Sequence, residues 1–317
     1  MPYWDVVTRS FAIAWRHRYL WLLALFSGEA GGGLSFNSTY SQPSNQRPDI
    51  GAIQANVTTW LGDHVAMIIA LGVLWLLLVV AFFILAAVCE GAVIRGAAEH
   101  DAERPFSLRQ AWAVGVHLMW VIVRFRLLLF LFYLPVIVLI VAWVIGFLIS
   151  FAGENRGAVA GLVLGALVLV LIWIAVAIYL FYLDRFGSRA IVLEERMALP
   201  AIARAHRLLF QRFGRSLLVG LLAIGVGIVV GVVLACFSVI LVLPFGIGLV
   251  ATYSSGSAAF WPVLVLAALI LLPIYLLVAG FLGAQSASYW TLAFRRLDIE
   301  YPPAYAAYPA IPPPQPQ

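Results

Sequence analysis

The hydrophobic positions of the chain gather into long runs, and these runs alternate with shorter segments that hold most of the charged residues. A transmembrane helix needs about 20 predominantly apolar residues, because each residue of α-helix adds about 1.5 Å along the axis. Most of the runs reach that length. The pattern therefore predicts an all-α integral membrane protein with about six transmembrane helices, at about residues 10–28, 65–89, 127–152, 158–183, 217–243 and 261–286.

The apolar stretch that begins after Arg215 runs to about Tyr253 and is too long for one crossing. Pro244 lies within this stretch, and Gly246 and Gly248 follow it. Proline has no backbone N–H and glycine favours turns, so we expect a helix to end there. A neutral connection that contains several serines would then lead to the last span.

The first predicted span is the least regular, because only residues 19–27 are apolar or small before Gly28 and Glu29. One interpretation is a cleaved signal peptide, in which Arg16 and Arg18 precede a short apolar core. The other is a tilted helix that enters the membrane from an interfacial segment. Helical spacing favours the second interpretation, since one face of such a helix carries Val7, Phe11, Ala14, Trp15, Arg18 and Leu22.

The arginines indicate the orientation of the chain. Seventeen of the nineteen lie in four segments, at residues 1–18, 90–126, 184–215 and 295–296. Short loops with an excess of basic residues face the cytoplasm, so both termini are predicted to be cytoplasmic. The chain has no lysine, which is typical of a GC-rich bacterial genome. The expected location is therefore the bacterial plasma membrane.

Composition excludes a water-soluble domain and indicates which kinds of partner the protein contacts. The chain is 64% hydrophobic and 10% charged, whereas soluble domains carry about 25% charged residues. The net charge of +5 follows the predicted topology and suits membrane lipids with anionic headgroups, so no nucleic-acid partner is expected. Cys89 and Cys236 both lie in apolar runs and define neither a disulfide framework nor a metal site. No cofactor is expected.

The cytoplasmic segments indicate an internal repeat. Arg95 and Arg189 each follow a predicted span, and His100-Asp101 and Glu194-Glu195 occupy corresponding places after them. A basic amphipathic segment follows each time, as expected of a helix in the headgroup region. We predict three units, each an interfacial helix followed by a pair of spans. The candidate interfacial basic residues are Arg204, Arg207, Arg212 and Arg215.

These segments also resemble a known family. The chain is similar there to the loop and amphipathic helix of bacterial membrane domains related to those fused to glycerophosphodiester phosphodiesterases. The segments concerned are Gly91–Glu99, Pro105–Trp112, Arg189–Glu194, Ala203–Phe210 and Arg215–Leu218. The resemblance covers about residues 3–296 and implies a six-helix membrane domain. No soluble catalytic barrel follows in this sequence, so neither phosphodiesterase activity nor a catalytic residue is carried over.

Motifs for catalysis are missing from the sequence. The histidines form no His-Glu-x-x-His pair, and no serine lies in a Gly-x-Ser-x-Gly turn. Two acidic positions are candidate functional charges, because a charge within the bilayer is costly. Glu29 would lie near mid-membrane if the first helix continues, or in the outer interface or a water-filled crevice if it ends. Glu90 is expected to form a neutralising pair with Arg95 at the inner surface or to belong to a substrate path.

Glycine spacing gives the remaining intramembrane signal. Gly161 with Gly165, and Gly227 with Gly231, form Gly-x-x-x-Gly pairs that let another helix approach closely. We expect them to serve packing within the chain or contact with a protein partner or a second copy.

The tail at residues 298–317 is rich in proline and is expected to be a disordered cytoplasmic extension.

The expected function is that of a non-enzymatic accessory or scaffolding component of the bacterial cell envelope or of a larger membrane complex. Few charges within the predicted spans and no catalytic constellation support this hypothesis, while several surfaces suit association. The alternative is a transporter or channel for a small solute or lipid. The internal repeat and the expected break at Pro244 favour that alternative, since transporters place broken helices at their substrate sites.

Overall fold

The computed structural model describes residues 3–29, 50–152, 156–255 and 259–297. These residues form eight α-helices. Three helices are short: α1 (Tyr3–Arg16), α2 (Tyr19–Phe26) and α6 (Ala198–Gln211). Five are long: α3 (Ile50–Asp101), α4 (Leu108–Ala152), α5 (Arg156–Glu194), α7 (Phe213–Ser254) and α8 (Phe260–Leu297). The predicted all-α class is confirmed for the described part of the chain.

The five long helices are also long and apolar enough to cross a membrane. They contain the predicted spans from residue 65 onwards. The first predicted span, residues 10–28, is instead divided between α1 and α2, with a bend at His17 and Arg18. With eight residues α2 is only about 12 Å long, which is too short to cross a bilayer. The bend is held by Trp21, whose indole Nε1 donates to the carbonyl of Ala14 at 2.7 Å.

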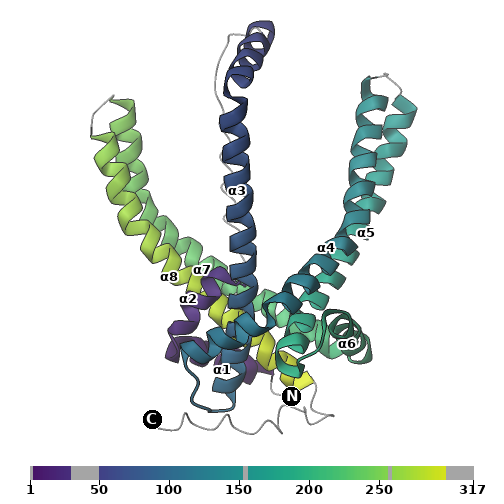
Figure 1. Ribbon diagram of the computed structural model, residues 1–317, viewed down its shortest axis with the longest axis vertical. Coiled ribbons are helices and arrows are strands. Elements are labelled where there is room, and N and C mark those ends of the chain that lie inside the picture. The colour runs from purple at the N-terminus through teal and green to yellow at the C-terminus, as the bar shows by residue number, and fades with distance from the viewer. Residues whose placement is uncertain (1–2, 30–49, 153–155, 256–258, 298–317) are drawn as a thin grey trace.

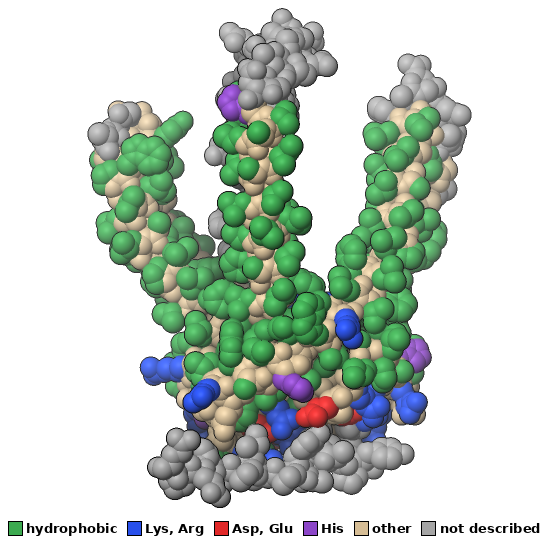
Figure 2. Space-filling model, viewed as in Figure 1, with side chains coloured by type: hydrophobic (Ala, Val, Ile, Leu, Met, Phe, Trp, Pro, Cys, Tyr) green, Lys and Arg blue, Asp and Glu red, His purple; other side chains and the backbone are tan. Residues whose placement is uncertain are grey.

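The helices form a packed base from which three arms project (Figure 1). One arm is α3 alone, the second is the hairpin of α4 and α5, and the third is the hairpin of α7 and α8. The short helices α1, α2 and α6 lie in the base, beside the ends of the long helices. The arms are covered with hydrophobic side chains on the face seen in Figure 2, and the charged side chains gather at the base.

Two boundaries differ from those predicted. The expected helix end at Pro244 is wrong, because α7 continues through this proline to Ser254. Membrane helices tolerate proline where local adjustments satisfy the freed backbone groups. The second amphipathic segment is also shorter than expected: α6 ends at Gln211, and Arg215 already belongs to α7. Its buried face consists mainly of alanine and leucine, whereas Phe210 and Phe213 are exposed.

The core of the molecule lies in the base. Its buried side chains come from the base ends of α3, α4, α5 and α8 and from the short helices. Three glycines allow close approach there: a Cβ added at Gly115 would overlap the carbonyl of Val88, one at Gly187 would overlap Phe125, and one at Gly220 would overlap Tyr182. The tightest helix contacts are therefore made by glycines outside the predicted pairs.

The predicted glycine pairs pack against nothing comparable within the chain. A Cβ added at Gly161, Gly227 or Gly231 would meet no atom within 4 Å, and one at Gly165 would lie 3.8 Å from Trp143. The interpretation of these pairs as tight packing sites within the chain is therefore wrong for the described structure. A Gly-x-x-x-Gly spacing permits close approach but does not say whether another helix of the same chain reaches it.

Candidate functional site

Six ionisable residues meet in the interior of the base, and we call them the buried charge cluster. They come from the end of α2 and from α3, α4 and α5, and they are Glu29, Glu90, Arg126, Asp184, Arg185 and Arg189. Three carboxylates thus lie with three guanidinium groups. Burying a single charge costs several kcal/mol, so a cluster of this kind requires that its charges be paired. The formal charges of these six groups cancel, and five of the groups form ion pairs, whereas Asp184 forms none within the described residues.

Glu29 is the carboxylate that ties α2 to α5. Its Oε1 accepts a hydrogen bond from Nη2 of Arg189 at 2.7 Å, and its other oxygen is in contact with Nη1 of Arg185. The side chain of Arg189 is completely buried and that of Glu29 is 4% exposed. Gly28, with a φ of +77°, turns the chain out of α2 just before this carboxylate.

Helix α2 ends at Phe26, so the expectation that the first helix continues past Glu29 is wrong. Glu29 lies in the base among the basic segments and not at an outer interface. It pairs with arginines of the segment 184–215, which the arginine pattern assigns to the cytoplasm. The reason is the bend at His17 and Arg18, which keeps α2 in the base instead of extending it across the membrane.

Glu90 and Arg95 have different partners from those expected. Glu90 Oε2 accepts from Nη2 of Arg126 at 2.6 Å, and the same Nη2 lies 3.1 Å from the carbonyl of Ser27. Arg95 instead pairs with Glu99, 2.9 Å away and four residues later on α3. The predicted pairing of Glu90 with Arg95 is wrong because residues five apart do not share a helix face, whereas residues four apart do.

Arg126, Asp184, Arg185 and Arg189 complete the site, but sequence reasoning did not single them out as functional. Each lies where an apolar run meets a basic segment, which is the usual place of an interfacial anchor. A signal was present in the spacing of Arg185 and Arg189, since residues four apart on a helix point the same way. What the sequence could not provide was the carboxylate opposite them, because Glu29 is 160 residues from Arg189.

A small cavity of about 290 Å³ adjoins Glu29 between α7 and α8. It brings together two features that the sequence singled out separately, because Gly227 and Gly231 line it as well. Two of its other polar side chains are engaged elsewhere: Gln285 donates to Ser10 Oγ at 3.2 Å, and the hydroxyl of Tyr289 donates to the carbonyl of Val219 at 2.7 Å.

A second charge network joins the outer part of the base. Asp101, at the end of α3, pairs with Arg9 of α1 and with Arg295 of α8. Close by, the rings of His17 and His100 stack with centroids 3.4 Å apart, and Nε2 of His100 lies 2.6 Å from the hydroxyl of Tyr19. Burial and the neighbouring Arg16 lower the pKa of His17. This network holds the bend between α1 and α2 against α3.

A belt of unpaired arginines surrounds the base. Six exposed arginines make no ion pair with any carboxylate in the described ranges, and they are Arg16, Arg18, Arg109, Arg124, Arg207 and Arg215. Blue side chains accordingly appear around the base in Figure 2. Of the predicted interfacial residues, Arg207 and Arg215 belong to this belt. Arg204 pairs with Glu194 and is mostly buried, and Arg212 separates α6 from α7.

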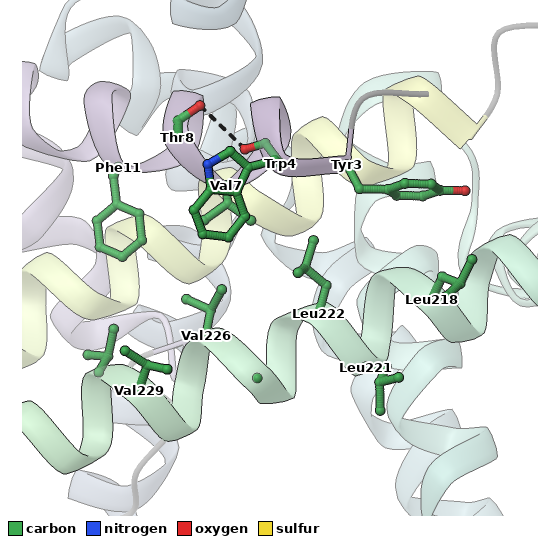
Figure 3. A pocket seen from close by; sticks show the side chains of 12 residues that line it. Tyr3, Trp4, Val7, Thr8, Phe11, Leu218, Leu221, Leu222, Val226 and Val229 are labelled. Carbon is green, nitrogen blue, oxygen red and sulfur yellow. Dashed lines mark hydrogen bonds between the residues drawn. The ribbon is translucent and has the colours of Figure 1, made fainter.

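An apolar groove of about 820 Å³ lies between α1 and α7 (Figure 3). Phe11 and Val7 of α1 face Val229 and Val226 of α7. Thr8 also lines the groove, and its hydroxyl donates a hydrogen bond to the carbonyl of Trp4 at 3.4 Å. The lining of this groove includes no charged side chain.

A protein-built metal centre is not found among the described residues, because nowhere in them do three or more His, Cys, Asp or Glu side chains gather as a metal ion requires.

The fold and the site together define an all-helical protein with five helices suited to crossing a membrane and a charge cluster buried at their base. The chain belongs to a family of unknown function, DUF7544, which matches residues 7–293. No curated protein and no solved structure matches it. The resemblance to phosphodiesterase-associated membrane domains is independent of this match and stays a prediction.

Proposed function

We propose that this protein is a non-enzymatic scaffold or accessory component of a bacterial plasma membrane complex, with its arginine-rich base on the cytoplasmic side. The observation that carries the proposal is the division of polar and apolar groups. The charges inside the base neutralise one another, whereas the arms expose apolar side chains and stand apart from each other.

The arms supply the surface for partners. Their exposed residues include small ones as well as large ones, and a Cβ at Gly161 or Gly146 would enter open space. In lipid, helices associate through close packing and not through the hydrophobic effect, so small residues on an arm favour contact with a partner helix. The base then fixes the position of the arms, as a scaffold requires.

The test is purification of the tagged chain in native nanodiscs, with mass spectrometry of the proteins that come with it. We expect a partner in constant ratio to the chain. Gly161→Leu together with Gly165→Leu should reduce its recovery at least fivefold without changing the thermal stability of the base. Gly214→Leu, which also adds a side chain to open space but lies at the start of α7 and outside the arms, is the matched control. Recovery of the chain without any protein partner contradicts the proposal.

A transporter for a small solute or lipid is the alternative, and the cavity between Glu29 and the glycines of α7 favours it. Transport through this cavity predicts that Gly231→Leu, which fills it, abolishes solute uptake by proteoliposomes while the fold persists. The scaffold proposal predicts that proteoliposomes with the wild-type protein take up no solute.

A further inference from the structure

A second apolar groove, of about 510 Å³, lies between the short helix α2 and the long helices α3 and α4. Its lining is apolar apart from one cation and one thiol, and consists of Leu22, Leu23, Phe26, Leu85, Cys89, Leu108, Arg109 and Trp112. The volume falls within the range of about 300–1,000 Å³ that is usual for small-molecule sites. Unlike the groove between α1 and α7, it includes a charged side chain.

Two arginines of the unpaired belt belong to the helices that form this groove: Arg18 immediately precedes α2, and Arg109 is on α4. Arg109 lines the groove with the aliphatic part of its side chain, and this residue is exposed. Arg18 lies on the same helix face as Leu22 and Phe26, which follow at intervals of four residues. Neither arginine forms an ion pair within the described residues, so both guanidinium groups are available to an anion outside the chain.

Both arginines lie at the end of the groove that is nearer the base. Helices α3 and α4 run antiparallel with Gly115 against Val88, so Arg109, six residues earlier on α4, lies further towards the base. Tyr19 reaches His100 and Leu20 packs against Gly96, so the start of α2 is at that end too. Leu85 marks the opposite end, where α3 continues into its arm. Cations at one end and apolar walls leading towards the membrane match an amphiphile with an anionic head.

We propose that the groove of α2, α3 and α4 binds one anionic phospholipid, with its phosphate held between Arg18 and Arg109 and an acyl chain along Leu22, Phe26 and Leu85. Each part of the lipid meets a matching part of the site: the guanidinium groups donate to phosphate oxygens, and the apolar walls cover the chain. This site is independent of the scaffold proposal, because it needs no protein partner.

Native mass spectrometry of the full chain tests the site. The protein is exchanged into nanodiscs that contain phosphatidylglycerol and phosphatidylcholine in equal amounts, and the lipids retained after release are counted. We expect one phosphatidylglycerol in preference to phosphatidylcholine. Arg18→Gln and Arg109→Gln should each lower this preference about fivefold, as expected of one basic residue near an anionic surface. Arg207→Gln, which removes an unpaired arginine outside the groove, should leave it unchanged.

A second pair of variants separates the groove from general charge. Leu22→Trp should fill the groove and remove the retained lipid while all arginines remain, whereas Leu221→Trp fills the groove between α1 and α7 and should have no effect. Both leucines are exposed, so neither change disturbs the core. Equal loss of lipid in Arg207→Gln and Arg109→Gln, retention without headgroup preference, or retention by Leu22→Trp would each overturn the proposal.

Discussion

At the scale of single residues, the main finding is that the ionisable groups inside the base serve one another. Arg189 is fully buried and depends on Glu29 for its ion pair, and Arg126 connects Glu90 to the backbone of Ser27. Burying each of these charges costs free energy, because a charge removed from water is stabilised only by good geometry with a partner. Their value here lies in position, since they join helices that are far apart in the sequence.

Glu29→Gln tests this role. The change leaves Arg185 and Arg189 without their shared carboxylate, and breaking a buried pair in this way costs about 3–5 kcal/mol. We expect a lower unfolding temperature in detergent, measured by the fluorescence of the tryptophans. Glu103→Gln, in an exposed carboxylate at the edge of the base, should change it little. The double variant Glu29→Gln with Arg189→Met should recover part of the loss, and a double variant less stable than either single one would contradict a structural pairing.

His17 makes the base sensitive to acid. Its pKa is below the ordinary value of 6.5 because of burial first and Arg16 second, so the folded state favours the neutral ring. The groups that face it are His100, Tyr19 and Arg16. The unfolded chain binds a proton at about pH 6.5 and the folded chain only at lower pH, so stability present above pH 6.5 is lost as the pH falls below it. Between pH 7.5 and 5, the wild type should therefore lose more thermal stability than His17→Gln, and equal losses would refute this assignment.

At the scale of helices, the glycines fall into two groups: some lie in tight contacts between helices, and others lie on open helix faces. Gly115 and Gly220 lie where two helices of the base touch, whereas Gly227 faces a cavity. Motif spacing emphasised the wrong group. The motif Gly-x-x-x-Gly is local, but the contact it serves depends on which helix is opposite, and that is decided by the whole fold.

Gly115→Ala should destabilise the base, because the new Cβ overlaps the carbonyl of Val88 and the two helices must separate. A loss of about 1–3 kcal/mol is usual for overpacking of this kind. Gly227→Ala is the matched control, since it adds the same methyl group to open space and replaces glycine with a better helix former. The unfolding temperatures of the two variants give the comparison, and a Gly115→Ala protein as stable as the wild type would show that α3 and α4 are not in contact there.

Sequence alone predicted the long helices well because their signal is local. A run such as 65–89 is apolar over its whole length, and this is enough to define a helix suited to a membrane. The bend at His17 escaped prediction for the opposite reason: the amphipathic spacing from Val7 to Leu22 continues across it without interruption. The partners of Glu29 and Glu90 were out of reach, because they are set by how α4 and α5 pack and not by neighbours in the chain.

At the scale of the whole molecule, a rigid base positions arms that make few contacts with one another. The charge cluster and the network around Asp101 both lie in the base, where they connect α1, α3, α4, α5 and α8. The arms carry apolar surface and no charged side chain among the exposed residues of their described outer parts. This division is the basis of the scaffold proposal, in which the base holds the arms and the arms hold the partners.

The most direct test of the scaffold proposal is the mass of the particle that contains this chain. Native mass spectrometry of the wild type, extracted in nanodiscs from its own membrane, gives the composition of that particle whatever the identity of the partner. We expect a discrete complex that is heavier than the 34.7 kDa chain by the mass of one or more additional protein subunits. A particle that contains a single copy of the chain and only lipid, at every extraction condition that preserves the fold, would show that the protein is not a scaffold.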